Sequence, residues 1–274
     1  MVNRRIKKLR YLFVASLVLL ILIYFNESSS IRNLNNDLIC AVRTNKSYLK
    51  RAKAVFETWG KECDRIVFLA SNFTDEIPIV SFDIDDDLVP YEKITKKMYA
   101  VLPKLYQAHP GYKWYLIGDD DTFVYVDNLR TFLSTKIYTD NIIYGRICYN
   151  GEETPKSESH LAGGSSYIIP NHGMSQLTSK ILNDNKYCPF SNVDDKDISQ
   201  CLRMLGFKYG QTRDENGMER FNHENNFKDK RCCTKSYISF HHLTPPLIYN
   251  MYKFRHNLTD YAPLINDTSF QAIL

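Results

Sequence analysis

Three consecutive aspartates follow directly on an apolar run, and this feature constrains the fold of the chain more than any other. Residues 114–118 have the composition of a buried strand, and Asp119, Asp120 and Asp121 come immediately after it. Aspartate is depleted in strands, and adjacent carboxylates repel one another unless a cation lies among them. Open α/β sheets bind ligands at the carboxyl ends of their strands, so the run predicts a Mg²⁺ or Mn²⁺ site for a substrate diphosphate. The alternative is an acidic turn, of the kind that residues 83–87 also suggest.

Strands and helices alternate along the chain, which predicts the α/β class. Short apolar runs indicate the expected strands, and apolar residues spaced three to four positions apart indicate the expected helices. The expected strands are residues 37–42, 65–70, 114–118 and 167–169, and the expected helices are residues 50–59, 94–109, 126–133 and 198–205. This order favours a mostly parallel sheet with helices on both faces, a nucleotide-binding, Rossmann-like architecture. With 274 residues and 44% apolar content, the chain can build one substantial core or two small ones.

The N-terminal region has the pattern of a membrane anchor. Five basic residues lie within residues 1–10, and residues 11–25 carry no charge. A cleaved signal peptide is the alternative, but no small-x-small cleavage site interrupts the apolar run. We therefore expect a cytoplasmic tail (1–10), a transmembrane signal anchor (11–25), a short stem (26–36) and a lumenal catalytic domain (37–274). Basic residues stay cytoplasmic, so this order predicts a single-pass type II protein of the Golgi or early secretory membrane.

Sequons and cysteines support a lumenal location. Asn-X-Ser/Thr acceptor sites occur at Asn45, Asn72, Asn257 and Asn266. All seven cysteines, at positions 40, 63, 148, 188, 201, 232 and 233, lie beyond the apolar run. In an oxidising compartment most of them should be paired, and the odd one is either free or links two chains into a homodimer. The five N-terminal basic residues exceed the net charge of +4, so we expect no nucleic-acid partner.

Three features of the second half complete a candidate site. Gly163 and Gly164 precede an apolar strand, where a sugar can approach the backbone, or they form an ordinary turn. Asp194 and Asp195 open a helix, and on sequence alone a helix-capping role is favoured for them. His241 ends an alternating stretch at residues 236–240 and is a candidate third metal ligand beside the aspartates, although a single histidine is more often structural.

Together these motifs resemble those of the animal β-1,3-glycosyltransferases of glycosyltransferase family 31, which include Fringe. The resemblance is greatest to the core 1 β-1,3-galactosyltransferase (T-synthase) branch. The matching segments cover nearly all of the expected lumenal region: residues 38–40, 54–63, 114–129, 162–164, 194–201, 232–233 and 239–241. The family's usual Glu-Asp pair is Asp194-Asp195 here, and an aromatic-rich insert before the cysteine pair is largely missing.

The resemblance implies a GT-A fold and an inverting, metal-dependent transfer from a UDP-sugar. Position by position, it implies that Asp119, Asp121 and His241 hold Mn²⁺, with Mg²⁺ as an alternative, on the diphosphate. It places Asp120 near the ribose and makes Asp195 the catalytic base. Asp119 and Asp120, with Gly163 and Gly164, would then contact the UDP-sugar donor.

The function that the resemblance implies is transfer of galactose from UDP-galactose to GalNAc-Ser/Thr of an O-glycosylated glycoprotein, which is core 1 O-glycan synthesis. One alternative is a different donor or acceptor, such as Fringe-type transfer of GlcNAc to O-linked fucose. Another is a non-catalytic, chaperone-like family member, which the intact acidic triplet, Asp195 and His241 argue against.

We also expect a disulfide framework. Cys40 and Cys63 lie at the ends of the first two expected strands, and Cys188 and Cys201 flank the segment that contains Asp195, so each pair should be bridged. Cys148 should then join Cys232 or Cys233, and the remaining one of these two is left unpaired.

Overall fold

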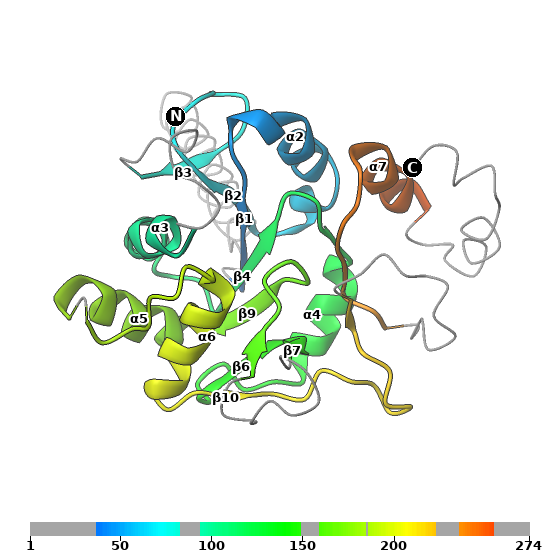
Figure 1. The fold of residues 1–274 in the computed structure, drawn as a ribbon. Helices are drawn as coiled ribbons and strands as arrows, with labels where there is room; N and C mark the ends of the chain where they lie inside the picture. The colour runs from blue at the N-terminus through cyan, green and yellow to red at the C-terminus, as the bar shows by residue number, and fades with distance from the viewer. Residues whose placement is uncertain (1–36, 83–93, 149–158, 185, 223–235, 255–274) are drawn as a thin grey trace, which may run out of the picture. The chain divides into compact units, whose positions relative to one another are not determined.

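A seven-stranded sheet lies at the centre of the computed structural model, which describes residues 37–82, 94–148, 159–184, 186–222 and 236–254 (Figure 1). All of these residues belong to a unit that covers residues 36–274. The α-helices are α2 (Leu49–Glu57), α3 (Ile94–Ala108), α4 (Val126–Ser134), α5 (Asn171–Asn183), α6 (Asp194–Met204) and α7 (Pro245–Phe254), and short 3₁₀ helices are η1 (Lys46–Tyr48) and η2 (Trp59–Glu62). The strands are β1 (Leu38–Arg43), β2 (Arg65–Ala70), β3 (Ile79–Ser81), β4 (Trp114–Asp119), β5 (Phe123–Val124), β6 (Ile142–Gly145), β7 (Ile147–Cys148), β8 (His160–Leu161), β9 (Tyr167–Pro170), β10 (Lys208–Tyr209), β11 (Phe221–Asn222) and β12 (Ser239–Phe240).

The central sheet has the strand order β10-β6-β9-β4-β1-β2-β3. Strands β1, β2, β3 and β4 pair in parallel, as the alternation of strands and helices predicts, and β10 is parallel to β6. Strand β9 departs from this pattern because it runs antiparallel to both of its neighbours, β4 and β6. An antiparallel strand needs no helical crossover, and β9 is reached from β6 through the segment that carries the glycine pair. Its direction brings the residues just before β9 to the carboxyl end of β4.

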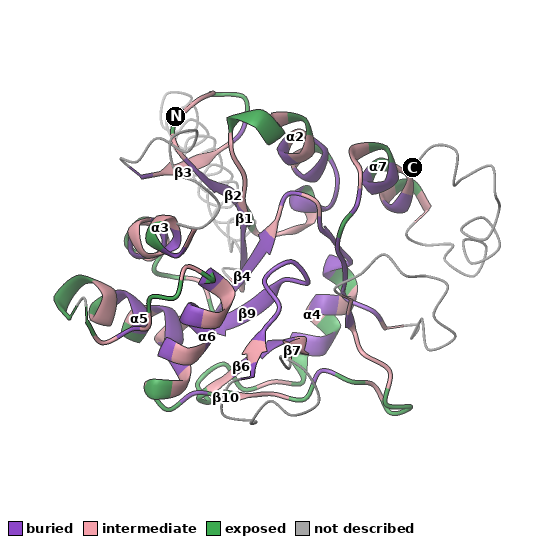
Figure 2. Cartoon of the chain, in the orientation of Figure 1, coloured by how far each residue is buried: buried purple, intermediate pink, exposed green. Residues whose placement is uncertain are grey.

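Helices cover both faces of the sheet, as predicted (Figure 2). Alternate residues of β1 enter two separate apolar clusters, which is the two-residue periodicity of a strand buried on both faces. One cluster contains Leu38, Cys40 and Val42 with the apolar sides of α2, α4 and α7. The other contains Ile39 and Ala41 with those of α3, α5 and α6. Strand β4, which leads into the acidic triplet, and its neighbours β1 and β9 are therefore anchored in the buried centre of the sheet.

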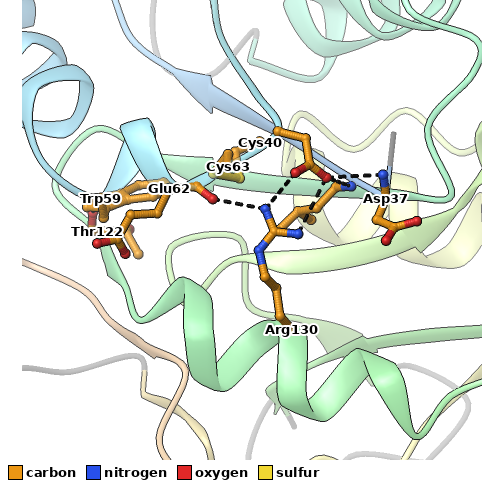
Figure 3. Close-up of a disulfide and its surroundings, with 9 residues drawn as sticks. Asp37, Cys40, Trp59, Glu62, Cys63, Thr122 and Arg130 are labelled. Carbon is orange, nitrogen blue, oxygen red and sulfur yellow. Dashed lines mark hydrogen bonds and ion pairs between the residues drawn. A yellow bond between two sulfur atoms is a disulfide. The ribbon is translucent and has the colours of Figure 1, made fainter. Parts of the chain in front are cut away.

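Two of the expected disulfides are present. Cys40 in β1 is bonded to Cys63, and Cys188 is bonded to Cys201 in α6. Around the first bridge, Arg130 of α4 donates hydrogen bonds to the Glu62 carbonyl and to the carboxylate of Asp64 (Figure 3). Cys148 forms no disulfide with any described cysteine, and its expected partners at positions 232 and 233 lie outside the described residues.

Several other expectations concern parts of the chain that the structure does not describe. These are the tail, anchor and stem of residues 1–36, the acidic run at 83–87, and the sequons at Asn257 and Asn266. Within the described ranges, none of the helices has the length and apolar character needed to span a membrane. Of the two described sequons, Asn72 is exposed in the loop after β2, and Asn45 caps η1 by accepting a hydrogen bond from the Tyr48 N–H at 3.2 Å.

Candidate active site

A cleft of about 430 Å³ opens at the carboxyl ends of β1 and β4. Its lining includes all three aspartates of the acidic triplet, Asp119–Asp121, together with His241 and His242. The remaining lining comes from residues 43–51, from Leu69 of β2 and Phe82, and from the first turns of α3. The acidic triplet and the histidine singled out in the sequence therefore meet at one cleft on the edge of the sheet where open α/β folds bind ligands. The glycine pair and the two aspartates of α6 do not line this cleft themselves.

A short three-stranded sheet brings His241 to the acidic triplet. Strand β5 directly follows the triplet, and β12, which ends one residue before His241, pairs with it antiparallel. The Leu243 N–H also donates to the Asp121 carbonyl at 2.9 Å. As a result, His241 Nε2 lies 3.0 Å from Asp121 Oδ1 and 3.8 Å from Asp119 Oδ2. Of the alternating stretch at residues 236–240, only Ser239 and Phe240 form a strand. The end of this strand places His241 beside the acidic triplet, as expected.

The ligand atoms of Asp121, His241 and His242 all lie within 4.8 Å of one another, the spacing of a metal site. One carboxylate and two imidazoles form a donor set that Mn²⁺ accepts, whereas Mg²⁺ prefers oxygen ligands. His241 is only 7% exposed, and its ring stacks on that of His242 with 3.8 Å between the ring centroids. Burial by itself raises the pKa of Asp121, but the hydrogen bond and charge of His241 outweigh it and lower that pKa. These residues fit a divalent cation.

Asp119 has a different main partner from the one that the resemblance implies. Arg43, the last residue of β1, donates from Nε to Asp119 Oδ1 at 2.6 Å and from Nη2 to Asp119 Oδ2 at 2.7 Å. The same guanidinium donates from Nη1 to Asp194 Oδ2 at 2.7 Å. Although burial opposes it, the two carboxylates raise the pKa of Arg43 above its ordinary value. Asp119 therefore lies next to the candidate metal ligands Asp121 and His241, but its carboxylate is bonded to Arg43.

Asp120 is the most buried carboxylate of the triplet, with 5% of its surface exposed. It accepts a hydrogen bond from Thr44 Oγ1 at 2.7 Å, and Arg51 lies 3.7 Å from its other oxygen. Burial raises the pKa of Asp120 to about 7, and the charges of Asp119 and Asp121 act in the same direction. Arg51 also lies 3.3 Å from Asp121 Oδ2, so this arginine is next to one of the candidate metal ligands.

The two glycines lie against two different side chains of the site. The Gly163 N–H donates to Asp195 Oδ2 at 2.9 Å, which joins the glycine loop to the first turn of α6. A methyl group on Gly164 would lie only 2.5 Å from His241 Nε2 and closer still to Nδ1 and Cε1 of the same ring. Gly164 is therefore required by the position of His241, whereas a methyl group on Gly163 would need only a small shift of Asp195. The Thr122 hydroxyl donates to the Gly164 carbonyl at 2.7 Å and holds this loop beside the acidic triplet.

Neither Asp194 nor Asp195 is the N-cap residue of α6, although Asp195 does accept a hydrogen bond from an N–H of the first turn. Helix α6 begins at Asp194, and its N-cap residue Val193 provides no side-chain capping bond. Asp194 is instead buried against Arg43, while half-buried Asp195 accepts from Gly163 and from the N–H of the next residue, Lys196, at 2.7 Å. Burial raises the pKa of Asp194, and Arg43 opposes that shift. Each aspartate is thus bonded to another residue of the candidate site, Asp194 to Arg43 and Asp195 to Gly163.

Sequence reasoning missed four residues of the site: Arg43, Thr44, Arg51 and His242. A signal for the first two was available, since both come at the carboxyl end of the first predicted strand, the edge where the triplet was expected. In the structure, Arg43 is the direct parallel partner of Asp119 in the register of β1 and β4. Arg51 and His242 carried no comparable signal, because one is an ordinary basic residue of an amphipathic helix and the other follows His241.

Two relatives match more than half of the chain. Glycoprotein-N-acetylgalactosamine 3-beta-galactosyltransferase 1 of Xenopus laevis is 22% identical over 251 residues, which are 81% of this chain and 66% of that protein. Beta-1,3-glucosyltransferase of Mus musculus is 27% identical over 177 residues, which are 62% of this chain and 34% of that protein. The chain thus spans less than two thirds of the length of either relative.

Two solved structures align with lower similarity. The galactosyltransferase LgtC, in complex with donor and acceptor sugar analogs, aligns with a TM-score of 0.45 and 17% identity, over 76% of this chain and 87% of LgtC. A glycosyltransferase involved in the glycosylation of the major capsid of PBCV-1 aligns with a TM-score of 0.46 and 10% identity, over 80% of this chain and 99% of that one.

The family model described as galactosyltransferase matches residues 57–213, which is more than half of the chain. The matched region runs from the end of α2 through the acidic triplet, the glycine pair and α6, and so includes most of the residues that meet at the cleft. The chain therefore belongs to the galactosyltransferase family of glycosyltransferases.

Proposed function

We propose that this protein is a metal-dependent, inverting β-1,3-glycosyltransferase with a GT-A fold that transfers galactose from UDP-galactose to GalNAc-Ser/Thr. The observation that carries the proposal is the meeting of Asp121, His241 and His242 at a cleft that also holds Asp119 and Asp120. A cluster of carboxylates and imidazoles at the carboxyl edge of an α/β sheet suits a cation bound to a nucleotide diphosphate. Family membership and the Xenopus relative support galactose and a GalNAc acceptor, while the mouse relative makes glucose the first alternative donor sugar.

In this proposal the cation is held by Asp121 and His241, with His242 available as a third ligand. Asp119, the third ligand implied by the family resemblance, is paired with Arg43 and serves the donor side of the cleft instead. A bound Mn²⁺ would neutralise charge on the diphosphate and so favour departure of UDP. Asp120 would lie near the ribose, and Gly163 and Gly164 would let the donor sugar approach the backbone.

Asp195 would act as the general base. Its carboxylate would accept the proton of the acceptor hydroxyl while that oxygen forms a bond to the anomeric carbon and the bond from that carbon to UDP breaks. Attack on the face opposite UDP inverts the anomeric centre and produces the β-linkage. The Gly163 N–H bound to Asp195 Oδ2 restrains the carboxylate at the loop where the donor sugar would lie. A base restrained in this way loses little orientational freedom when the reaction begins.

The proposal also includes the location of the protein. The apolar residues 11–25, the sequons and the two disulfides support a single-pass type II protein of the Golgi or early secretory membrane, with the described residues in the lumen. The acceptor would then be a secreted or membrane glycoprotein that carries O-linked GalNAc. An unpaired thiol at position 232 or 233 would allow a disulfide-linked homodimer.

A donor and acceptor screen with the full-length protein in detergent tests the function. UDP-galactose, UDP-GlcNAc and UDP-glucose are each offered with a GalNAc-threonine peptide and with an O-fucosylated peptide, in the presence of Mn²⁺. We expect β-1,3-linked galactose on the GalNAc peptide only. Transfer of GlcNAc to the fucosylated peptide would replace the proposal with the Fringe-type alternative, and absence of transfer from every donor would favour the non-catalytic one.

A further inference from the structure

Arg43 is a largely buried cation at the end of β1 whose role goes beyond the reaction scheme above. Its side chain is 16% exposed, and three of its five N–H groups are bonded to carboxylates within 2.7 Å. Two of these bonds reach Asp119 at the end of β4, and the third reaches Asp194 at the start of α6. One guanidinium therefore joins a strand on the donor side of the cleft to the helix that carries Asp195.

The bond to Asp194 matters because that carboxylate is almost completely buried, with 4% of its surface exposed. A buried carboxylate without a partner is costly, so the ion pair holds the start of α6 against the end of β1. Asp194 is also the direct chain neighbour of Asp195, and a shift of its backbone would move the base. A lysine could keep the charge but not this geometry, because a single ammonium lacks the planar fork that reaches both carboxylates.

Other contacts hold the remainder of α6 but not its first residue. The Cys188–Cys201 bridge and the hydrogen bonds from Thr95 and Ser191 to the Asp197 carboxylate attach the body of the helix to α3 and to the preceding loop. A methyl group on Gly163 would lie 3.3 Å from Asp195 Oδ2 and 3.6 Å from Arg43 Nη2. Gly163 therefore lies beside both of these side chains.

We propose that Arg43 is a positioning residue for the transfer reaction, which fixes the start of α6, and with it the Asp195 carboxylate, relative to the donor side at Asp119. This inference rests on the proposed function, because it takes Asp195 as the base. It assigns Arg43 no contact with the donor. The residue acts through Asp194, and its effect should appear in the rate of transfer rather than in the affinity for the UDP-sugar.

The test compares Arg43→Lys with Asp194→Asn, the double variant and a matched control in the full-length protein. The control is Arg130→Lys, which weakens another arginine–carboxylate pair at the opposite end of β1, where Asp64 accepts the N–H groups of Asp37 and Leu38 (Figure 3). For each protein we would measure the melting temperature, kcat, KM for UDP-galactose, and hydrogen exchange of peptides that cover residues 160–166 and 193–198.

We expect Arg43→Lys to lower kcat by roughly 10–100-fold, because a misplacement near 1 Å at a reacting group costs on the order of 10²-fold. The KM for UDP-galactose should stay within about threefold, as expected for an interaction that acts in the chemical step. Amide exchange at Gly163 and in the first turn of α6 should become faster. The double variant should be no slower than the worse single variant, because both changes break the same bridge. Arg130→Lys should lower the melting temperature without changing kcat or this exchange.

A rise in KM with an unchanged kcat would overturn the inference, because it would place the effect of Arg43 on donor binding, directly or through Asp119, and not on the base. So would parental exchange at Gly163 and α6, or additive losses in the double variant. The exchange arm remains informative if the parent protein transfers no sugar. In that case the proposed function fails, while unchanged exchange in Arg43→Lys and Asp194→Asn would separately reject the positioning bridge.

Discussion

Replacement of Gly164 by alanine is the most direct test of the proposed metal centre, because the added methyl group would collide with the imidazole of the proposed ligand His241. The added carbon would lie 2.5 Å from His241 Nε2, whereas carbon and nitrogen atoms in contact normally lie about 3.5 Å apart. The Cε1 atom of the same ring would be closer still, so the imidazole would have to move by more than about 1 Å. His241 is buried and stacked on His242, so it has little space in which to move without leaving Asp121. Gly164 has no left-handed backbone conformation, so alanine adds crowding rather than backbone strain.

We expect Gly164→Ala to remain folded, with a loss of stability of about 1–3 kcal/mol that is typical of overpacking. The Mn²⁺ concentration for half-maximal activity should rise by roughly 10–100-fold, because His241 no longer meets Asp121 at binding distance. The assay is sugar transfer by the full-length protein across a Mn²⁺ series from micromolar to millimolar, with the melting temperature measured in parallel.

The neighbouring substitution Gly163→Ala is the matched control. Its methyl group would lie 3.2 Å from Asp195 Cβ, which requires only a small adjustment on the side of the base. We expect a slower transfer rate with the parental Mn²⁺ requirement. If Gly164→Ala kept both the parental activity and the parental Mn²⁺ requirement, His241 would not be a ligand and the reasoning from the glycine contact would be refuted.

Three further predictions follow from the site and the fold. EDTA should abolish transfer and Mn²⁺ should restore it, and Asp121→Ala should lose most activity with little change in melting temperature; full activity without a divalent cation would reject the ligand set. Asp195→Asn should lower the transfer rate by roughly 10²–10⁴ while UDP-sugar binding persists, whereas Asp127→Asn, which changes another acid in the first turn of a helix, should leave the rate unchanged. Joint replacement of Cys40 and Cys63 by alanine should cost about 3 kcal/mol of unfolding free energy by the loop-closure relation, given their separation of 23 residues, and an unchanged denaturation midpoint would contradict a stabilising role.

The secondary structure around the site followed closely from sequence periodicity. The second strand was expected at residues 65–70 and is β2, Arg65–Ala70, and the helix expected at 126–133 is α4, Val126–Ser134. Such elements are set by contacts among residues close in the chain, so their pattern is visible locally. The same local rule placed the acidic triplet at the end of β4, and position along the chain was enough to pair Cys40 with Cys63.

Long-range partnerships were decided only by the tertiary structure. Arg43 meets residues 76 and 151 positions away, and no local pattern distinguishes it from a basic residue at a strand end. The antiparallel direction of β9 also could not be predicted from the sequence, because an apolar strand can have the same composition in parallel and in antiparallel pairing. Yet that direction is what carries Gly163 and Gly164 to the edge where Asp119–Asp121 end. The sequence by itself identified the acidic triplet, the glycine pair and His241 as candidates for a site. Packing of the sheet decided which groups touch, because the energy of a buried ion pair or a close glycine contact depends on atoms that only the folded chain brings together.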